Sequence, residues 1–203
     1  ATDLHAGTTD PIMKAALLAL FLSTPGVIMS QQQHPTEGIP NSKVKVVIYE
    51  DLECPDCADF RRMLDEKLLP RYASTVTFVH MDFPLAKHPW ARKAAIAGRF
   101  FLASGNDLSV AYRRAVMKDQ DRIQPENFVA WLSRFAQSQG IEPAQVVAAL
   151  DDPKLAAAVE DDFQDGVSRG IAHTPTVLVN GHPFIETIPY EDVSKTIDAE
   201  LAR

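Results

Sequence analysis

The sequence predicts an α/β domain with a block of helices inserted between its two halves. Three observations predict it. Short β-branched runs occur at 44–49, 76–79 and 176–179, and apolar residues recur at helical spacing between the second and the third run. The third observation is composition: the 203-residue chain is 46% hydrophobic and 23% charged, as globular proteins are. This composition excludes wholesale disorder and a multi-span membrane protein.

The first half is expected to form a β-α-β unit. The run 44–49 is short, largely apolar and followed by acidic residues, as a buried central strand is. Apolar side chains then recur at helical spacing over 60–68, and Pro70 is expected to end that helix. The run 76–79 is expected to form the second strand. The junction between the first strand and the helix falls near Cys54.

The middle of the chain is expected to be a helical insertion over about 86–168. Pro143 and Pro153 suit first helical turns, and Asp152 precedes the second of them as a cap. Large aromatic side chains at helical spacing in this region favour a core over a substrate groove. They are Trp90, Phe100, Phe101, Trp131 and Phe135.

The second half is predicted as β-β-α. The run 176–179 precedes Asn180-Gly181, a strong signal for a β-hairpin. Phe184 and Ile185 are expected in the returning strand, and apolar residues at helical spacing over 190–201 indicate a closing helix.

The amino-terminal residues differ from the rest. Met13-Lys14, the apolar run 15–22 and the polar residues after it are typical of an export signal, so residues 1–30 are assigned to a signal or targeting segment. The alternative is an amphipathic helix that lies on the domain. A run shorter than about 20 residues predicts at most an amino-terminal membrane association. Residues 31–42 are expected to be a linker before a domain at 43–203, and export predicts a periplasmic or otherwise extracytoplasmic protein.

The charge balance limits the partners. Asp and Glu number 27 against 20 Lys and Arg, which gives a net charge of −7. Binding to a phosphate backbone needs a basic surface, so nucleic acid is excluded as a partner.

Cys54 and Cys57 are the two cysteines of the chain, and they follow the first predicted strand. Residues three apart in a first helical turn are close enough for a disulfide. Cys54 is placed beside the unpaired N–H groups and the positive end of the helix dipole, which favour a thiolate. Cys57 can then attack a mixed disulfide formed by Cys54, so the pair is predicted to be redox-active.

Three other interpretations of this pair stay open. A structural disulfide is weakly motivated, because closing so small a loop removes little chain entropy. Two thiolates would suit Cu(I), or half of a zinc site, although the histidines lack the usual close spacing for zinc. Inert thiols are the third. A metal-handling protein that binds Cu(I) or zinc is therefore kept as the alternative function.

Two separated segments resemble the DsbA-like branch of the thioredoxin superfamily. Residues 49–57, Tyr-Glu-Asp-Leu-Glu-Cys-Pro-Asp-Cys, resemble its active-site segment. Residues 170–181, Gly-Ile-Ala-His-Thr-Pro-Thr-Val-Leu-Val-Asn-Gly, resemble its loop in which a proline after a cis peptide bond faces the cysteines. Residues 88–91, His-Pro-Trp-Ala, look like the start of its helical insertion. The resemblance implies a thioredoxin-like fold with an inserted helical subdomain.

The same resemblance implies a thiol-disulfide oxidoreductase without a metal or organic cofactor. The site residues that it implies are Cys54, Cys57, Pro55, Asp56, Thr174 and Pro175. The first cysteine would attack, the second would resolve, and the cis-proline loop would pair with an extended substrate. The implied partners are protein substrates with thiols or disulfides and a redox partner protein, and the direction of exchange stays open.

Two residues depart from the family's pattern. Many relatives carry a buried acid six residues before the first cysteine, where this chain has Ile48, so Glu50 or a water would assist proton transfer. Asp56 stands where strongly oxidising relatives have histidine. Acidic side chains near Cys54 are mostly expected on a solvated surface. Their negative charge would raise the pKa of the Cys54 thiol and so make the pair less oxidising. They are Glu50, Asp51, Glu53, Asp56 and Asp59.

Overall fold

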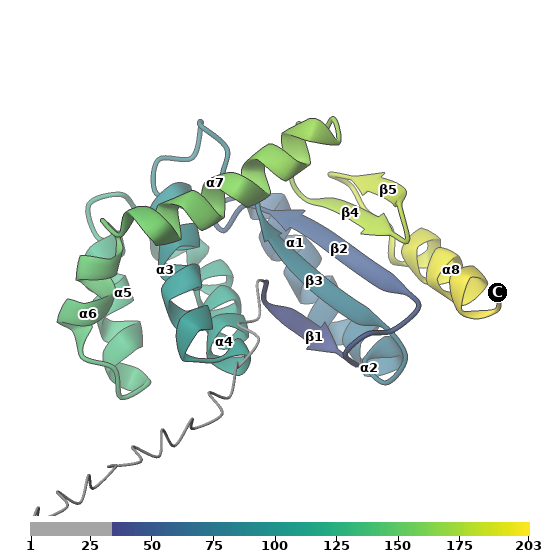
Figure 1. Ribbon diagram of the computed structural model, residues 1–203, viewed down its shortest axis with the longest axis horizontal. Coiled ribbons are helices and arrows are strands. Elements are labelled where there is room, and N and C mark those ends of the chain that lie inside the picture. Colours follow the sequence, from purple (N-terminus) through teal and green to yellow (C-terminus); the bar gives the residue numbers. More distant parts are fainter. Residues whose placement is uncertain (1–33) are drawn as a thin grey trace, which may run out of the picture. The chain divides into compact units, whose positions relative to one another are not determined.

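Strand β2 lies at the centre of a five-stranded sheet, as the sequence predicted for a buried strand (Figure 1). The computed structural model describes residues 34–203, so the expected signal segment and the first residues of the expected linker lie outside the described residues. The strands are β1 (Thr36–Gly38), β2 (Lys45–Glu50), β3 (Thr77–Asp82), β4 (Thr176–Val179) and β5 (His182–Ile185). Their order is β1-β3-β2-β4-β5, and β2 pairs parallel with β3 and antiparallel with β4.

Strand β1 lies within the segment 31–42 that was expected to be a linker, so this expectation is wrong for the described part of that segment. Thr36 stands opposite Val79 in an antiparallel pair with β3. Glu37 also forms an ion pair with Arg61. Backbone pairing and a charged contact hold this strand, whereas the prediction relied on apolar side chains. The sheet therefore begins before residue 43.

The helix after β2 continues past Pro70, which corrects the expectation that this proline ends it. Helix α1 (Pro55–Met63) passes through a π-helical turn (Leu64–Leu68) into α2 (Leu69–Tyr72). In the wider turn the Leu69 N–H donates to the carbonyl oxygen of Leu64, five residues back. Pro70 then lies in the first turn of the next segment, where its missing N–H removes no helical hydrogen bond.

A block of helices separates β3 from β4, as predicted. Its elements are α3 (Ala91–Ser104), α4 (Asn106–Lys118), a 3₁₀ turn (Gln120–Arg122), α5 (Phe128–Ser138), α6 (Pro143–Ala149) and α7 (Pro153–Ser168). The predicted aromatic core is confirmed: Trp90 stacks on Phe128 and Trp131 stacks on Phe135, with ring centroids 5.6 Å and 5.8 Å apart. Asp152 caps α7 by accepting a hydrogen bond of 2.8 Å from the backbone N–H of Lys154.

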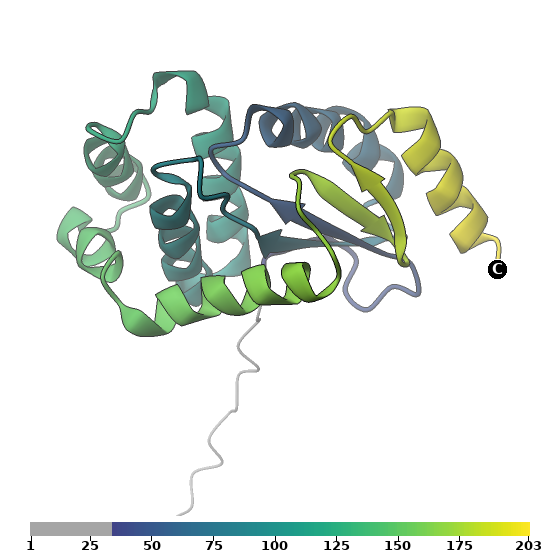
Figure 2. The same ribbon diagram turned by 90° about the horizontal axis from the view of Figure 1, so that it is seen from above.

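Helices cover both faces of the sheet (Figure 2). Ile48 and Phe78 face α1 and α8 (Tyr190–Leu201), and they share a buried cluster with Phe60 and Ile197. On the other face α7 lies against a cluster that contains Tyr49 and Phe83. Gly166 lets α7 approach this closely, because a Cβ atom there would lie 2.6 Å from the Phe83 ring.

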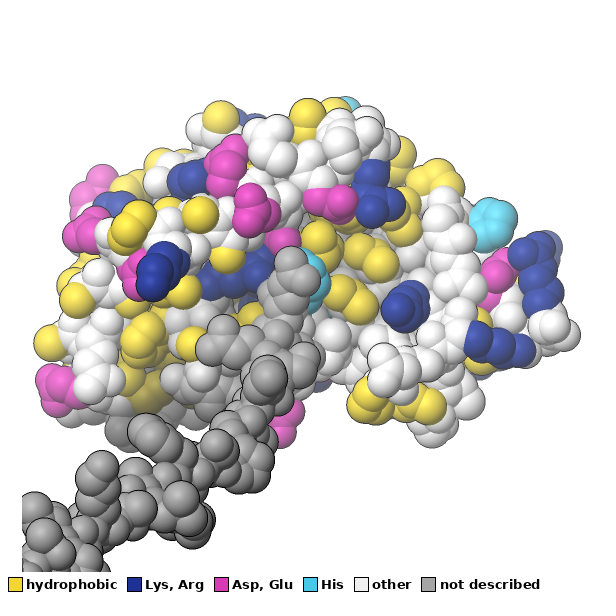
Figure 3. Space-filling model, viewed as in Figure 1, with side chains coloured by type: hydrophobic (Ala, Val, Ile, Leu, Met, Phe, Trp, Pro, Cys, Tyr) yellow, Lys and Arg dark blue, Asp and Glu magenta, His cyan; other side chains and the backbone are white. Residues whose placement is uncertain are grey.

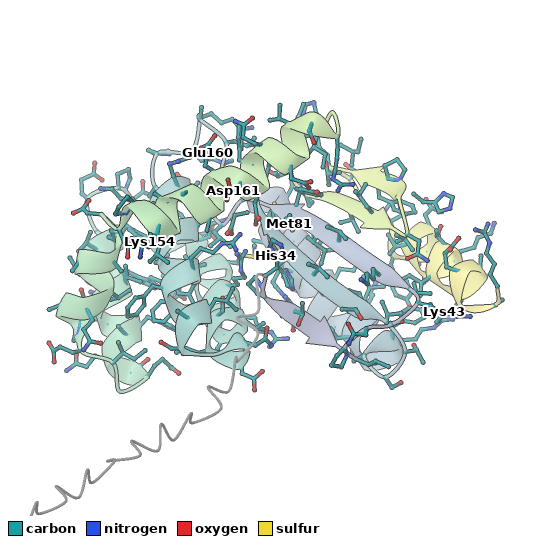
Figure 4. The ribbon with its side chains drawn as sticks, in the orientation of Figure 1. His34, Lys43, Met81, Lys154, Glu160 and Asp161 are labelled. Carbon is teal, nitrogen blue, oxygen red and sulfur yellow. The ribbon has the colours of Figure 1, made fainter. Side chains whose placement is uncertain are left out.

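Part of the second face extends beyond α7. Val47, Val79 and Leu178 line a hollow there together with Met81 and His34. Figure 3 shows hydrophobic side chains gathered over this part of the sheet, and Figure 4 places Met81 and His34 beneath α7. Across residues 34–203, none of the helices combines the length and the apolar character needed to cross a bilayer.

The hairpin predicted at Asn180-Gly181 joins β4 to β5. Both residues have left-handed backbone conformations, with φ of 45° and 93°. Turns of this kind match the twist of the two strands, and glycine adopts the conformation without strain.

Candidate active site

Cys54 and Cys57 lie on the first turn of α1, where β2 gives way to helix. Cys54 is the N-cap residue with an extended backbone, φ −79° and ψ 123°, and Pro55 takes the first helical position. The carbonyl oxygen of Cys54 accepts hydrogen bonds from the N–H groups of Cys57 and Ala58, at 3.1 and 3.2 Å. Both cysteines are free thiols in this structure. The sequence therefore predicted the local placement of the pair correctly.

The two cysteines differ in burial. Cys54 keeps 4% of its surface exposed and Cys57 keeps none. The Cys54 sulfur is less open than its place at a helix end suggested, because the residue belongs to the apolar cluster that includes Leu52 and Trp90. Cys54 is therefore the more exposed of the two residues.

The loop of Thr174 and Pro175 lies against Cys54, although 120 residues separate the contacting residues in sequence. The Thr174–Pro175 peptide bond is cis. In its thiol form, Cys54 donates a hydrogen bond of 3.4 Å from Sγ to the Thr174 carbonyl oxygen. The Thr174 hydroxyl is buried and has no hydrogen-bond partner among the described residues. The Pro175 carbonyl oxygen already accepts a hydrogen bond of 2.9 Å from the Glu186 N–H, so it pairs within the protein.

The pKa values of the two thiols move in opposite directions. A hydrogen bond from the Cys57 side chain is the largest influence on Cys54, and it lowers the Cys54 pKa to about 6 against the opposing effect of burial. Burial raises the pKa of Cys57 well above its usual range, and its contact with Cys54 adds to the effect. At neutral pH Cys54 is therefore the thiolate and Cys57 the thiol, which is the division that nucleophile and resolving group require.

Two of the five acidic residues near Cys54 are buried, which corrects the expectation of a mostly solvated acidic surface around it. Glu50 is 3% exposed and Asp51 is 1% exposed, whereas Asp56 and Asp59 lie on the surface as expected and Glu53 is half-buried. Each of the buried carboxylates has partners inside the protein, so it is removed from water without being left unpaired.

Glu50 belongs to a buried set of alternating charges, called the ionic cluster below. It consists of Glu37, Glu50, Arg61, His80, Asp82, Arg99, Arg113 and Asp162. Glu50 Oε1 contacts Arg113 Nη1 at 2.7 Å and His80 Nδ1 at 3.0 Å. Burial alone would raise the Glu50 pKa, but the charges of His80 and Arg113 lower it. Glu50 is therefore ionised, and its charge helps to raise the pKa of Cys57.

Two residues of the site were missed by the sequence analysis. Gln120 donates hydrogen bonds from Nε2 to the carbonyl oxygens of Leu52 and Cys54, at 2.9 and 3.1 Å. His88 contacts Asp51, with Nδ1 2.7 Å from Oδ2. Nothing in the sequence marks Gln120, because its contact with Cys54 spans 66 residues. The family-like segment at 88–91 was a signal for His88, but it was interpreted only as the start of a helix.

The metal interpretation gains no support from the described residues. Within 34–203 no group of three or more His, Cys, Asp or Glu side chains is gathered so that it could hold a metal ion. A metal bound by Cys54 and Cys57 would have to take its remaining ligands from elsewhere.

Comparison with known proteins points to one family. The family model described as Thioredoxin matches residues 23–199. Disulfide bond formation protein D of Bacillus subtilis is 25% identical over 173 residues, which cover 82% of this chain and 77% of that protein. Other curated relatives are Na(+)/H(+) antiporters, and the chain spans about a quarter of their length, 23% for the one from Mycolicibacterium gilvum.

Solved structures show the same fold. Oxidised BdbD from Bacillus subtilis superposes with a TM-score of 0.77 at 24% identity, covering 84% of this chain and 94% of that one. Alpha-DsbA1 from Wolbachia pipientis superposes with a TM-score of 0.73 at 18% identity, covering 90% of this chain and 94% of that one. The expectation of a thioredoxin-like fold with an inserted helical subdomain is confirmed. Because the Thioredoxin family model matches most of the chain, this protein belongs to the thioredoxin family, and its fold is that of the DsbA-like members.

Proposed function

We propose that the protein is a thiol-disulfide oxidoreductase that exchanges disulfides with protein substrates through Cys54 and Cys57. One observation carries the proposal: two neighbouring sulfurs on one helical turn have pKa values displaced in opposite directions, and the more accessible one is the thiolate. The name of the Bacillus subtilis relative, a disulfide bond formation protein, supports the same chemistry. Exchange between two cysteines and a substrate needs no metal or organic cofactor.

In the reducing direction the Cys54 thiolate attacks a substrate disulfide. A mixed disulfide forms and one substrate sulfur leaves as a thiolate. Cys57 then loses its proton to solvent and attacks Cys54 Sγ, which releases the second substrate sulfur and leaves a Cys54–Cys57 disulfide. The two electrons that the substrate gains come from the two cysteines.

In the oxidising direction the steps run in reverse. A substrate thiolate attacks Cys54 of the disulfide, Cys57 leaves as a thiolate and takes up a proton, and a second substrate thiolate displaces Cys54. The Cys54 pKa of about 6 makes it a good leaving group in this last step. A redox partner protein must then restore the starting state in either direction.

The proton acceptor for Cys57 is proposed to be water rather than Glu50. Ile48, at the position where many relatives carry an acid, lies in an apolar cluster. Glu50 is ionised, but its lowered pKa makes it a weak base. Its contacts with His80 and Arg113 occupy the carboxylate further.

The compartment is proposed to be periplasmic or otherwise extracytoplasmic. Support comes from the signal-like pattern within residues 1–30, because exported proteins meet the oxidising conditions in which disulfides persist. Detection of the protein in a periplasmic rather than a cytosolic fraction tests this part of the proposal.

The activity is tested by equilibrium with a series of glutathione redox buffers and by insulin reduction, with the Cys54→Ser variant as control. We expect a reversible two-electron couple in the wild type and loss of exchange in the variant. If wild type and variant behave alike, the thiols are inert and the proposal is wrong. Stoichiometric metal bound through both thiols after purification under reducing conditions would favour the metal-handling alternative instead.

A further inference from the structure

The carboxylate of Asp51 ties two loops together beside the cysteine pair. Its Oδ1 accepts a hydrogen bond of 2.7 Å from the Glu53 N–H, within its own loop. Its Oδ2 accepts from the Leu85 N–H at 2.7 Å and contacts His88 Nδ1, also at 2.7 Å. Because Oδ2 already accepts the Leu85 N–H, we assign the proton of the His88 contact to Nδ1, which then donates it to the carboxylate. The Asp51 side chain has no exposed surface, and that of His88 is 14% exposed.

The main chain of the same residue touches both cysteines. The Asp51 N–H donates a hydrogen bond of 3.4 Å to Cys57 Sγ. The Asp51 carbonyl oxygen accepts one of 3.1 Å from the Cys54 N–H. The position of Asp51 therefore sets the hydrogen bond to the Cys57 sulfur and helps to fix the backbone position of Cys54.

We propose that His88 is a positioning residue for the redox pair: its imidazole holds the Asp51 carboxylate, and the carboxylate holds the Asp51 N–H against the Cys57 sulfur. The proposal rests on the proposed function. His88 acts through Asp51 and is not proposed to touch a sulfur or a substrate.

The physical consequence is a bias between the two redox forms. A thiol or thiolate sulfur carries more electron density than a disulfide sulfur, so an N–H donor stabilises the reduced pair more than the oxidised pair. Without the imidazole, Oδ2 keeps only the Leu85 N–H in a site closed to water. The loop around Asp51 then relaxes, the contact with Cys57 weakens, and the pair becomes less oxidising.

The test measures the equilibrium constant with glutathione for the wild type and three variants of the full chain. We expect His88→Leu to shift this constant toward the protein disulfide by about two- to tenfold, the range for loss of one hydrogen bond. His88→Asn should restore most of the wild-type value, because its amide N–H lies near the place of Nδ1. His182→Leu is the matched control, since the side chain of that histidine is 55% exposed and its ion-pair partner, Glu200, lies 3.5 Å away.

Unfolding of the oxidised and reduced forms separates positioning from simple stability. A purely structural role predicts that His88→Leu lowers both stabilities equally and leaves the glutathione constant unchanged, and that result would overturn the inference. Failure of His88→Asn to restore the constant would overturn it too. A wild type that does not exchange with glutathione contradicts the proposed function instead, so the two failures are distinguishable.

Discussion

The cysteine pair and the ionic cluster are both buried and both contain groups with displaced pKa values, but their contents differ in kind. In the ionic cluster each charge meets an opposite one: Arg113 bridges Glu50 and Asp82, and Arg99 contacts Asp82 at 2.6 Å. In the pair, Cys54 Sγ contacts neutral groups, the Cys57 side chain and the Thr174 carbonyl oxygen. The displaced pKa values of this molecule therefore have two origins: fixed opposite charges in the ionic cluster, and burial with neutral hydrogen-bond partners in the cysteine pair.

The direction of the shifts shows the same contrast. In the ionic cluster, burial opposes the charges of Glu37, Glu50 and Asp82, yet the pKa values of these acids are lowered. The pKa values of His80 and Arg113 are raised in turn, so these five groups stay ionised. The two cysteines are split instead, one down and one up. Groups that all stay ionised stabilise the fold. A pair with one ionised and one protonated thiol is instead suited to reaction.

Breaking the ionic cluster should give the largest change in stability. Arg113→Met removes the positive charge between Glu50 and Asp82, and we expect a loss of about 3–5 kcal/mol in the free energy of unfolding, because two buried carboxylates lose a partner. Urea unfolding measures it. The matched control is Arg92→Met, whose pair with Glu160 is 51% and 40% exposed and should matter by less than about 1 kcal/mol. Equal losses would show that the cluster is not the structural region described here.

The opposite pKa shifts of Cys54 and Cys57 predict that the reactivity of the reduced pair depends on pH. The alkylation rate of reduced protein should rise with pH through a midpoint of about 6, as Cys54 ionises. In Cys57→Ala the midpoint should move up, because the hydrogen bond from Cys57 is the largest influence that lowers it. A wild-type midpoint near that of free cysteine, or no movement in the variant, contradicts the account.

The same shift has a consequence for folding. Because the Cys54 pKa in the folded state lies below the unfolded value of 9.0, its ionisation stabilises the reduced form. This stabilisation is complete above the unfolded value and is lost as the pH falls through about 6. Reduced wild type should therefore gain stability between these two values relative to Cys54→Ser.

The contact of Gln120 with the active-site loop should give a smaller effect. Gln120→Ala removes two hydrogen bonds to the carbonyl oxygens of Leu52 and Cys54, and we expect a loss of about 0.5–1.5 kcal/mol in the free energy of unfolding. Thermal or urea unfolding measures it. Gln164→Ala, which loses only an exposed contact with Glu160, is the control and should be close to neutral. A neutral Gln120→Ala would mean that the loop is held without it.

The smallest expected effect is electrostatic tuning by Asp56, an exposed residue beside Cys54. A single exposed charge at about 7 Å contributes on the order of 0.6 kcal/mol, so Asp56→His should raise the reduction potential by roughly 10–30 mV. Asp56→Asn removes the charge alone and should give the lower part of that range. Titration in glutathione buffers measures both, and an unchanged or lower potential in Asp56→His counts against the electrostatic account.

Where sequence reasoning succeeded, the signal was local. β-Branched runs predicted β2, β3 and β4, helical spacing predicted the inserted block, and Asn180-Gly181 predicted the hairpin. Sequence reasoning failed where contacts between distant segments determine the structure. β1 is held by pairing with β3, and the π-helical turn that accommodates Pro70 leaves no mark in composition. Acidic Glu50 and Asp51 suggested a solvated surface, since their partners lie far along the chain.

By itself, the sequence determined that two thiols three residues apart would stand on the first turn of a helix after a central strand. That outcome depends on backbone hydrogen bonds and side-chain periodicity among neighbours. Only the tertiary structure decided that His88 contacts Asp51, that Gln120 binds the loop of Cys54, and that Glu50 is buried against His80 and Arg113. Exclusion of water and contacts between distant segments set those properties, and both arise only when the folded chain brings the segments together.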